Sequence, residues 1–516
     1  MSFPSGLSRS TCAGLGLLLA IPASLTLEDK APQPATTVAS AKKTAPEPPS
    51  KLTTPQIDLR KAVRLALPEP KGVLQAATFQ TPDGKSGWVL RIPGAHPIAT
   101  PAYADDMLFV GGGYGSHEFY ALDSDTGKVI WKIQTGDDGP TAAVVADGLV
   151  AFNTESCTLV IVDEKTGRVI WQEWLGDPLM SQPAIDKGVL YMAHPASTGR
   201  PANARKRAEF HPAAASPGGS HRLLAADLHT GRHIWEQEIS GDVLTAPVIS
   251  AGVVYFATFD GTSYALNAAD GSVVWMKATA SASAPVVSRG ELYETRKTVN
   301  GKETVEGIAR VDAKNGAARD KDLLARSEAN YLKPGKGGGV ALSSAEVATL
   351  DSAVGFSSAP ASAKLAQASE NVGVSSVVGA WAYQGSRAAI SKGQILNAQG
   401  NYINSVRASD GKQTWQAEVV GNRDAAGGQV FSPPAVGHDY LYLAGAAGYL
   451  VAVRQNDGAV GFSYSLTAPM TFQPALAKGN IYEGTSDGRL ICLKTGSADA
   501  DGWYAWGGNA QHNKVQ

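Results

Sequence analysis

The sequence is poor in cysteine and in charged residues, and each shortage excludes a class of function. Its three cysteines, Cys12, Cys157 and Cys492, are too few for a disulfide framework and too far apart for a Cys-x-x-Cys metal site. Charged residues make up 18% of the 516 residues and sum to a net charge of -2. Because no positive field is present to attract phosphate groups, we expect no nucleic-acid partner.

No apolar run at the N-terminus is long enough to span a bilayer. The stretch 13–27 follows Arg9, and its fifteen residues fall short of the ~20 that a membrane helix needs. We interpret residues 1–27 as a secretory signal, which predicts an exported protein of the periplasm or extracellular space, associated with the cell envelope and without a transmembrane span. Residues 28–58, rich in Pro, Ala, Thr and Lys, are predicted to be a tether.

Glycine and tryptophan, in contrast, are abundant. The chain holds 56 glycines and ten tryptophans, and 43% of its residues are hydrophobic. Such a composition is typical of many short strands joined by tight turns, with enough apolar side chains for a large core. The composition therefore predicts an all-β protein.

A short motif recurs along the chain. Residues 121–131 (ALDSDTGKVIW) reappear in altered form in copies that end at Trp171, Trp235 and Trp275, and weaker copies follow. Each copy centres on a glycine where a tight turn is expected; these are Gly127, Gly167, Gly231, Gly271, Gly316, Gly411, Gly458 and Gly496. The base period of about 40 residues is the length of one four-stranded propeller blade. We therefore predict a single domain over residues 59–516, an eight-bladed β-propeller of four-stranded antiparallel blades.

The repeated tryptophans are predicted to dock one blade on the next. A single blade leaves both faces of its sheet apolar, so its stability depends on stacking against its neighbours. A tryptophan at a constant place in each repeat supplies a large buried area at that interface. The residues assigned to this role are Trp131, Trp171, Trp235, Trp275 and Trp415.

The pattern small-x-Asp-x-x-[Thr/Asp]-Gly-x-x-x-Trp resembles the repeat of pyrroloquinoline quinone (PQQ)-type β-propellers over about residues 86–496. None of the ten tryptophans is followed by Asp, which argues against WD40 blades. The resemblance implies the propeller fold. Its superfamily includes the eight-bladed quinoprotein alcohol dehydrogenases and the non-catalytic outer-membrane assembly propeller, and in character the chain is most similar to the latter.

The resemblance alone is weak evidence for catalysis. A quinoprotein dehydrogenase of this class holds PQQ with Ca²⁺ at the ring axis and commonly places a disulfide between adjacent cysteines against the cofactor. No two cysteines are adjacent in this sequence, and Cys157 and Cys492 are interpreted as structural thiols. Most aspartates belong to the turn motif, where they accept backbone hydrogen bonds. We therefore assign no catalytic, cofactor-binding or metal-binding residue.

Two segments exceed the repeat period and are predicted to be excursions from the blades. The first, residues 194–220, contains a run of basic side chains, namely Arg200, Arg205, Lys206 and Arg207. This run is interpreted either as a contact for an acidic partner or as a solvated charged face. The second, residues 317–376, is rich in Gly, Ser and Ala and is predicted to be a long loop.

The last repeat lacks its outer strand, and the N-terminal sequence supplies a match. After Gly496 the expected Gly-x-x-x-Trp strand is replaced by Ser-Ala-Asp-Ala-Asp. Residues 87–92 (GWVLRI) carry the missing pattern ahead of the first inner strand. Because an open blade edge would leave backbone groups unpaired, we predict that an N-terminal strand closes the ring.

These observations favour a non-enzymatic binding or scaffolding propeller of the cell envelope. In this interpretation the protein is a monomeric platform for protein–protein interaction, contacts other envelope proteins and binds no cofactor. The alternative is a PQQ- and Ca²⁺-dependent quinoprotein oxidoreductase or sensor with a divergent cofactor site. The fold serves both functions, so only the site can decide between them. The aromatic tail, residues 503–513, is predicted to pack on the ring.

Overall fold

The computed structural model describes most of the region predicted to be the propeller. The described residues are 54–113, 115–154, 157–176, 181–196, 221–243, 245–300, 303–319, 321–327, 388–421, 430–470 and 472–502. Their helical elements are two 3-10 turns, η1 (Leu59–Lys61) and η2 (Pro93–Ala95), and in this part of the chain no helix has the length or apolar character to cross a membrane. The remaining regular structure is β-strand, as the composition predicts.

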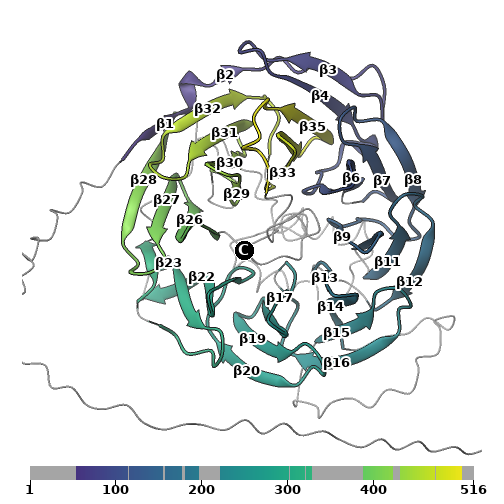
Figure 1. Cartoon of the computed structure of the whole chain (residues 1–516), viewed down its shortest axis with the longest axis vertical. Coiled ribbons are helices and arrows are strands. Elements are labelled where there is room, and N and C mark those ends of the chain that lie inside the picture. The colour runs from purple at the N-terminus through teal and green to yellow at the C-terminus, as the bar shows by residue number, and fades with distance from the viewer. Residues whose placement is uncertain are drawn as a thin grey trace, which may run out of the picture. The chain divides into compact units, whose positions relative to one another are not determined.

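Blades 1 to 5 are antiparallel four-stranded sheets, each built from consecutive strands (Figure 1). From the inner to the outer edge, their strands are β5 (Ala102–Ala104), β6 (Met107–Gly111), β7 (Glu118–Asp123) and β8 (Val129–Gln134) in blade 1; β9 (Val144–Ala146), β10 (Leu149–Asn153), β11 (Thr158–Asp163) and β12 (Val169–Trp174) in blade 2; β13 (Ala184–Asp186), β14 (Val189–Pro195), β15 (His221–Asp227) and β16 (His233–Ile239) in blade 3; β17 (Val248–Ser250), β18 (Val253–Ala257), β19 (Thr262–Asn267) and β20 (Val273–Ala278) in blade 4; and β21 (Val286–Ser288), β22 (Glu291–Asn300), β23 (Glu303–Asp312) and β24 (Leu323–Ser327) in blade 5.

Blades 6 to 8 have five strands each, because N-terminal strands join them. From the inner to the outer edge, they are β25 (Ala388–Ser391), β26 (Gln394–Gln399), β27 (Tyr402–Arg407), β28 (Gln413–Val420) and β1 (Gln56–Asp58) in blade 6; β29 (Ala435–Val436), β30 (Tyr440–Ala444), β31 (Tyr449–Arg454), β32 (Val460–Ser465) and β2 (Val63–Arg64) in blade 7; and β33 (Ala475–Ala477), β34 (Asn480–Gly484), β35 (Arg489–Lys494), β4 (Ser86–Arg91) and β3 (Ala77–Gln80) in blade 8.

The N-terminal strand β4 closes the ring. It pairs antiparallel with β35, from Arg91 opposite Arg489 to Ser86 opposite Lys494, and so forms the fourth strand of blade 8. The inner strand β33 of blade 8 contacts the inner strand β5 of blade 1, as each inner strand contacts the next one around the ring. The predicted eight-bladed propeller with N-terminal closure is confirmed.

The middle strands are apolar on both faces because each blade lies between two others. In blade 1 every residue of β6 and four of the six residues of β7 are buried. A strand that is covered on both sides needs a continuous apolar run, whereas a strand with one wet face alternates. The outer strand β8 alternates in this way, with Trp131 buried between the exposed Ile130 and Lys132.

A contact between a tryptophan and a turn glycine joins most neighbouring blades. Trp131 of blade 1 donates from Nε1 to the Glu164 carbonyl of blade 2 at 2.9 Å, and a Cβ added to Gly167 in the same turn would lie 2.7 Å from the indole. Gly167 also has a φ of 68°, which side chains disfavour. The same contact joins Trp88 to Gly127, Trp171 to Gly231, Trp235 to Gly271, Trp275 to Gly316 and Trp415 to Gly458.

Two junctions differ. A Cβ added to Gly411 of blade 6 would meet Leu323 Cδ2 of β24 at 2.7 Å, because blade 5 carries leucine where six other blades carry tryptophan. For Gly496 of blade 8 no described atom lies within 4 Å of such a Cβ. Both glycines keep a positive φ, so the turn persists where the indole contact does not.

The structure moves three predicted boundaries. β1 lies inside the predicted tether 28–58, and its Ile57 is buried opposite Val419. The end of β14 and the whole of β24 lie inside the predicted excursions 194–220 and 317–376. The tryptophan-based repeat missed β24 because its buried core residue is Leu323.

Several predictions fall on residues that the structure does not describe. These are the signal 1–27, most of the tether, the greater parts of both excursions and the tail 503–513. The basic residues of the first excursion, Arg200, Arg205, Lys206 and Arg207, lie there too.

Loss of a docking tryptophan should destabilise the fold according to how deeply the indole is buried. Trp415 is fully buried and donates to the Gln455 carbonyl at 2.6 Å, so Trp415→Ala should lower the free energy of unfolding by about 3 to 5 kcal/mol. Trp171 is only partly buried, and Trp171→Ala should cost less, about 2 kcal/mol. Urea denaturation followed by circular dichroism measures both. Equal losses in the two variants would contradict this account.

Candidate functional site

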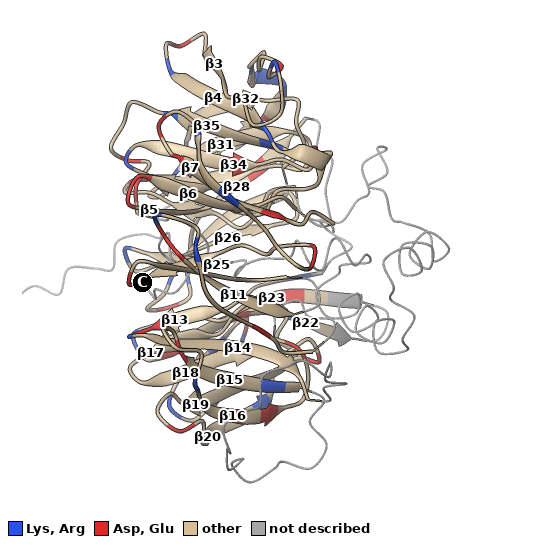
Figure 2. Ribbon diagram, turned by 90° about the vertical axis from the view of Figure 1, so that its right-hand side faces the viewer, with Lys and Arg blue, Asp and Glu red and all other residues tan. Residues whose placement is uncertain are grey.

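One face of the ring gathers the hairpin turns that join the first strand of each blade to the second; we call it the turn face (Figures 1 and 2). In most blades such a turn holds a residue with positive φ followed by glycine, as in Lys187-Gly188, Arg289-Gly290 and Lys392-Gly393. Two consecutive residues with positive φ make the tight turn that fits the twist of a hairpin. The side chain before the glycine is free to vary, so these turns set the chemistry of the opening.

The charges at these turns are unevenly distributed around the opening. Blades 1 and 2 carry the aspartates Asp105, Asp106 and Asp147, whereas blades 3, 5, 6 and 8 carry Lys187, Arg289, Lys392 and Lys478. Two ion pairs link adjacent blades: Lys478 Nζ lies 2.6 Å from Asp106 Oδ1, and Lys392 Nζ lies 2.7 Å from Asp439 Oδ1. Exposed pairs of this kind add little stability, so their main effect is on the charge pattern.

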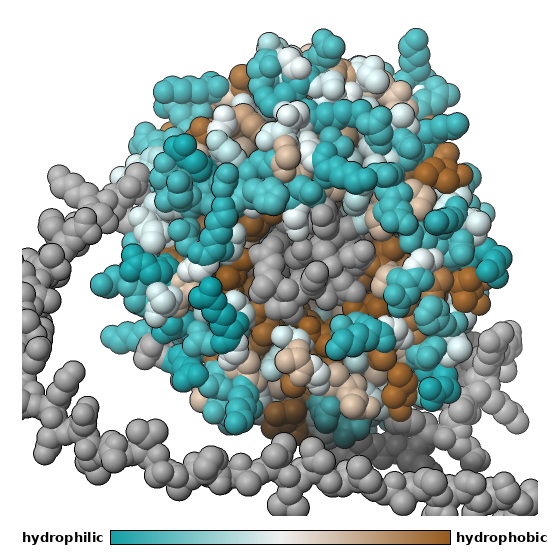
Figure 3. Space-filling view, in the orientation of Figure 1, coloured by the Kyte–Doolittle hydropathy of each residue, from teal (hydrophilic) through white to brown (hydrophobic). Residues whose placement is uncertain are grey.

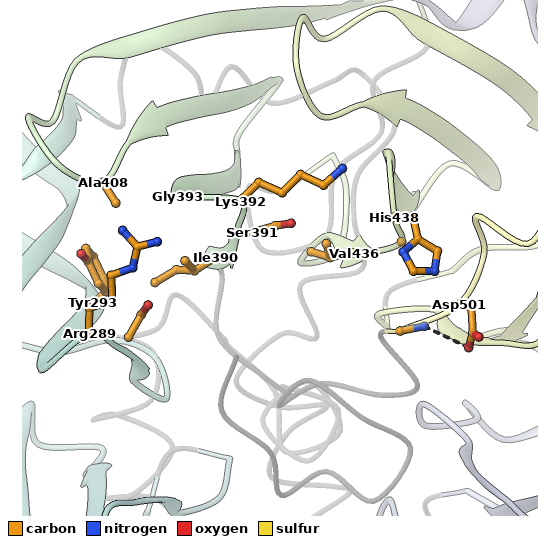
Figure 4. A pocket seen from close by; sticks show the side chains of 13 residues that line it. Arg289, Tyr293, Ile390, Ser391, Lys392, Gly393, Ala408, Val436, His438 and Asp501 are labelled. Atoms are coloured by element: carbon orange, nitrogen blue, oxygen red, sulfur yellow. Dashed lines mark hydrogen bonds between the residues drawn. The ribbon is translucent and has the colours of Figure 1, made fainter.

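A pocket of about 510 Å³ opens on the turn face between blades 5, 6 and 7 (Figure 4). The β21–β22, β25–β26 and β29–β30 turns line it together with Asp501 and Gly502 near the end of the described chain. Hydrophobic residues gather around the centre of this face, while polar residues cover its periphery (Figure 3). The pocket therefore lies where the apolar interior of the ring approaches solvent.

The pocket combines an apolar floor with basic side chains. Ile390 and Val436 are buried and form part of the lining. Arg289 stands on one side, His438 lies on the opposite side, and Lys392 extends between them (Figure 4). Asp501 also lines the pocket, and its carboxylate accepts from the backbone amides of Lys478 and Gly502. With Arg289, Lys392 and His438 beside it, the lining suits a ligand with an apolar body and a negatively charged group.

The C-terminal segment completes one wall, because Asp499 anchors it to blade 7. The carboxylate of Asp499 accepts from the Asp439 amide at 2.6 Å and from the Tyr442 hydroxyl at 2.7 Å. Burial, reinforced by this hydrogen bond, raises the pKa of Tyr442. Gly437 permits the close approach, since a Cβ there would lie 2.4 Å from the Asp499 carbonyl oxygen.

Two buried glutamates are the groups that the sequence interpretation missed. Glu294 and Glu483 occupy the fourth position of β22 and β34, and each is 1% exposed. Most other blades place an apolar residue at this position, namely Val110, Phe152, Met192, Phe256 and Leu443. The turn motif does not include this position. Aligning the second strands of the eight blades with one another would have shown that Glu294 and Glu483 replace apolar residues.

Burial changes the acidity of both groups. It raises the pKa of Glu294 to about 7, although Ser263 Oγ donates to its Oε2 at 2.9 Å and partly opposes the shift. Burial raises the pKa of Glu483 well above 4.5, and neither of its oxygens has a hydrogen-bond partner among the described residues. Buried carboxyl groups with a raised pKa can act as general acids in enzymes. Neither glutamate lines the turn-face pocket, so neither is assigned such a role there.

A partly buried histidine joins the outer strands of blades 2 and 3. His233 Nε2 lies 2.9 Å from Glu173 Oε2, and its Nδ1 lies 3.0 Å from Glu236 Oε1. Burial alone would lower the pKa of His233, but the two carboxylates outweigh it and raise the value to about 9. His233 and its two glutamates thus form an ion-pair cluster that links blades 2 and 3, and they do not line the pocket.

The described residues do not fit a Ca²⁺-bound quinone. Nowhere among them do three His, Cys, Asp or Glu side chains come together as a metal site. Cys157 and Cys492 are separate buried thiols in different blades, so they cannot form a disulfide against a cofactor. The absence of a cofactor stays a prediction.

Glu483 should make stability depend on pH. In the unfolded chain it ionises near pH 4.5, whereas in the folded protein it holds its proton to higher pH. Folding must therefore take up a proton, and the contribution of Glu483 becomes less favourable as the pH rises from about 4.5 towards the folded-state pKa. Glu483→Gln should be more stable than the parent at pH 8, and the difference should disappear near pH 4.

Urea denaturation between pH 4 and pH 8 tests this. The same replacement at Glu418, which is only partly buried, is the matched control for removal of a carboxyl group. Parallel profiles for the parent and Glu483→Gln would mean that Glu483 ionises normally in the folded protein.

Comparison with known proteins gives sequence relatives of two kinds. The chain is 27% identical over 190 residues to the outer membrane protein assembly factor BamB of Yersinia pestis, a match that covers 34% of this chain and 42% of that protein. It is also 27% identical over 239 residues to the tetrathionate hydrolase of Acidithiobacillus ferrooxidans, covering 41% of this chain and 44% of the relative. The chain thus spans less than half the length of either relative.

Comparison with solved structures agrees on the fold. A quinohemoprotein alcohol dehydrogenase from Pseudomonas putida HK5 superposes with a TM-score of 0.50 at 11% identity, covering 84% of this chain and 78% of that one. A family model described as outer membrane protein assembly factor BamB matches residues 71–199, 211–333 and 365–503, well over half of the chain. This chain therefore belongs to the BamB family of PQQ-like β-propellers.

Proposed function

We propose that the protein is a non-catalytic binding platform of the cell envelope. In this proposal residues 1–27 direct export, the folded ring acts as a monomer, and other envelope proteins are its partners. Membership of the BamB family supports an assembly role. The observation that carries the proposal is the turn-face pocket between blades 5, 6 and 7, whose apolar floor and basic side chains suit an apolar and acidic segment of a partner protein.

The pocket has the features of a protein contact site. Three separate hairpin turns and the C-terminal segment build it, so its shape depends on the packing of three blades. Arg289 is exposed and forms no ion pair among the described residues, which leaves its guanidinium free to bind a carboxylate. Buried apolar side chains beside such a group are typical of contact points that contribute most to binding.

A photo-crosslinking experiment tests the proposal. A photoreactive amino acid at Ser391, in the pocket, should crosslink an envelope protein, whereas the same group at Asp186 should not. Asp186 occupies the matching place in the β13–β14 turn of blade 3, outside the pocket. Reversing charge with Arg289→Glu and Lys392→Glu should abolish the crosslink, because like charges would then face an acidic partner.

Lys187→Glu is the matched control, since Lys187 and Lys392 both have a φ of 50° and both precede a turn glycine. It should leave the crosslink intact, and all variants should melt like the parent because the replaced side chains are exposed. If Lys187→Glu also lost the crosslink, binding would depend on the net charge of the protein, and the pocket would be rejected as the binding site.

The alternative, a PQQ- and Ca²⁺-dependent oxidoreductase or sensor, rests on the shared fold and makes an opposite prediction. The described residues supply no cluster of metal-ligating side chains, so PQQ with Ca²⁺ should give no saturable heat in calorimetry. Binding with a Kd below about 1 μM would defeat the platform proposal.

A further inference from the structure

The outer edges of blades 6 and 7 show how this fold accepts an added strand. β1 pairs in parallel with β28, with Gln56, Ile57 and Asp58 opposite Glu418, Val419 and Val420. β2 pairs in parallel with β32 over two residues. In the last blade, β3 covers the outer edge of β4, the next strand in the chain, and pairs with it antiparallel. An extended segment therefore binds an outer strand by backbone hydrogen bonds, and the one on β28 inserts a single buried apolar residue, Ile57, between two polar ones.

The outer strands of blades 1 to 5 end their sheets and have no such cover among the described residues (Figure 1). Uncovered edges are usually protected by charged side chains, which hinder pairing with another chain. β8 carries Lys132, β12 carries Glu173, and β16 carries Glu236 and Glu238. β24 carries Arg326.

β20 of blade 4 exposes the most apolar side chains of these edges. Its sequence, VVWMKA, contains one lysine and no acidic residue, as does that of β8, so its apolar side chains distinguish it. Val273, Val274 and Met276 are 45, 49 and 52% exposed, and they account for three of the eight large hydrophobic side chains exposed in the described structure. Because side chains alternate along a strand, Val274 and Met276 share one face of β20, while the buried Trp275 belongs to the other.

We propose that β20 binds an extended segment of a partner protein as a parallel fifth strand. The segment would have apolar residues at alternate positions, which would cover Val274 and Met276, and no proline where it pairs. Backbone hydrogen bonds would supply affinity, and the apolar face of β20 would supply selectivity. The parallel direction is inferred from β1 and β2, which bind outer strands far from them in the sequence; β3 pairs antiparallel with β4, but the two are consecutive strands.

The same geometry argues against a second copy of this chain as the occupant. Two β20 strands that met edge to edge about a twofold axis would run antiparallel, because a symmetric contact pairs each residue with its counterpart in reverse order. In blades 6 and 7, by contrast, the added strand is parallel. The occupant is therefore a different polypeptide.

The test uses the full chain and a defined probe, a fluorescent peptide of about seven residues in which Val and Thr alternate between terminal lysines. Fluorescence anisotropy should show saturable binding, and hydrogen exchange should slow in β20 and not in β8. The double variant Val274→Lys and Met276→Lys should weaken binding by about tenfold or more, because charge beside an edge opposes pairing. Ile130→Lys on β8, where Ile130 is 47% exposed, is the matched control and should bind normally.

Direction and independence are tested in the same system. A photoreactive group at the N-terminus of the peptide should crosslink near Val273, and one at its C-terminus near Ala278; the reverse would contradict parallel pairing. The pocket variant Arg289→Glu with Lys392→Glu should bind the peptide normally, so the two proposals can fail separately. Unchanged binding in the lysine variant, protection of all outer strands alike, or dimerisation of the peptide-free protein through β20 would overturn the proposal.

Discussion

The ring depends on one interaction, the packing of an outer-strand indole on the turn glycine of the next blade. Each indole buries a large apolar surface and donates one hydrogen bond to the same turn, as Trp131 does to the Glu164 carbonyl. The glycine must have a positive φ and no Cβ, so two sequence features are coupled at each of the six junctions that have this contact. The contact links neighbouring blades only, so the stability of the ring depends on the sum of these junctions.

The junction of blades 5 and 6 meets this constraint differently, and its interior is correspondingly polar. Leu323 replaces the indole, and the buried side chains there include Thr295, Asn397 and Asn404. Arg326 donates from Nη2 to Gln416 Oε1 at 2.9 Å near the same junction. Buried polar side chains need hydrogen-bond partners, so they fix the packing geometry more narrowly than apolar side chains do and tolerate substitution less well. The turn-face pocket lies beside this junction. Departures from the sequence rules of a fold are expected at functional sites, so the loss of the tryptophan contact here is consistent with a binding role.

The repeat predicted the architecture because the fold is built from local, periodic contacts. The eight turn glycines and the missing outer strand after Gly496 were enough to predict eight blades and the closing strand β4. The repeat could not predict β24, because Leu323 does not carry the tryptophan pattern, or β1, because a single buried Ile57 in a polar stretch has no periodicity. The pocket could not be predicted either: Arg289, Lys392 and His438 are far apart in sequence, and the stacking of blades 5, 6 and 7 brings their turns together.

Two surfaces with different physics follow from the one scaffold. The turn-face pocket combines charge with a small apolar floor, whereas β20 offers backbone hydrogen-bonding groups beside exposed Val274 and Met276. One surface lies at the mouth of the ring and the other on its circumference, so an occupant of the first leaves the second accessible (Figure 1). Each blade packs on both of its neighbours. In the two proposals taken together, the ring would hold two segments at a constant separation, which raises the local concentration of one beside the other.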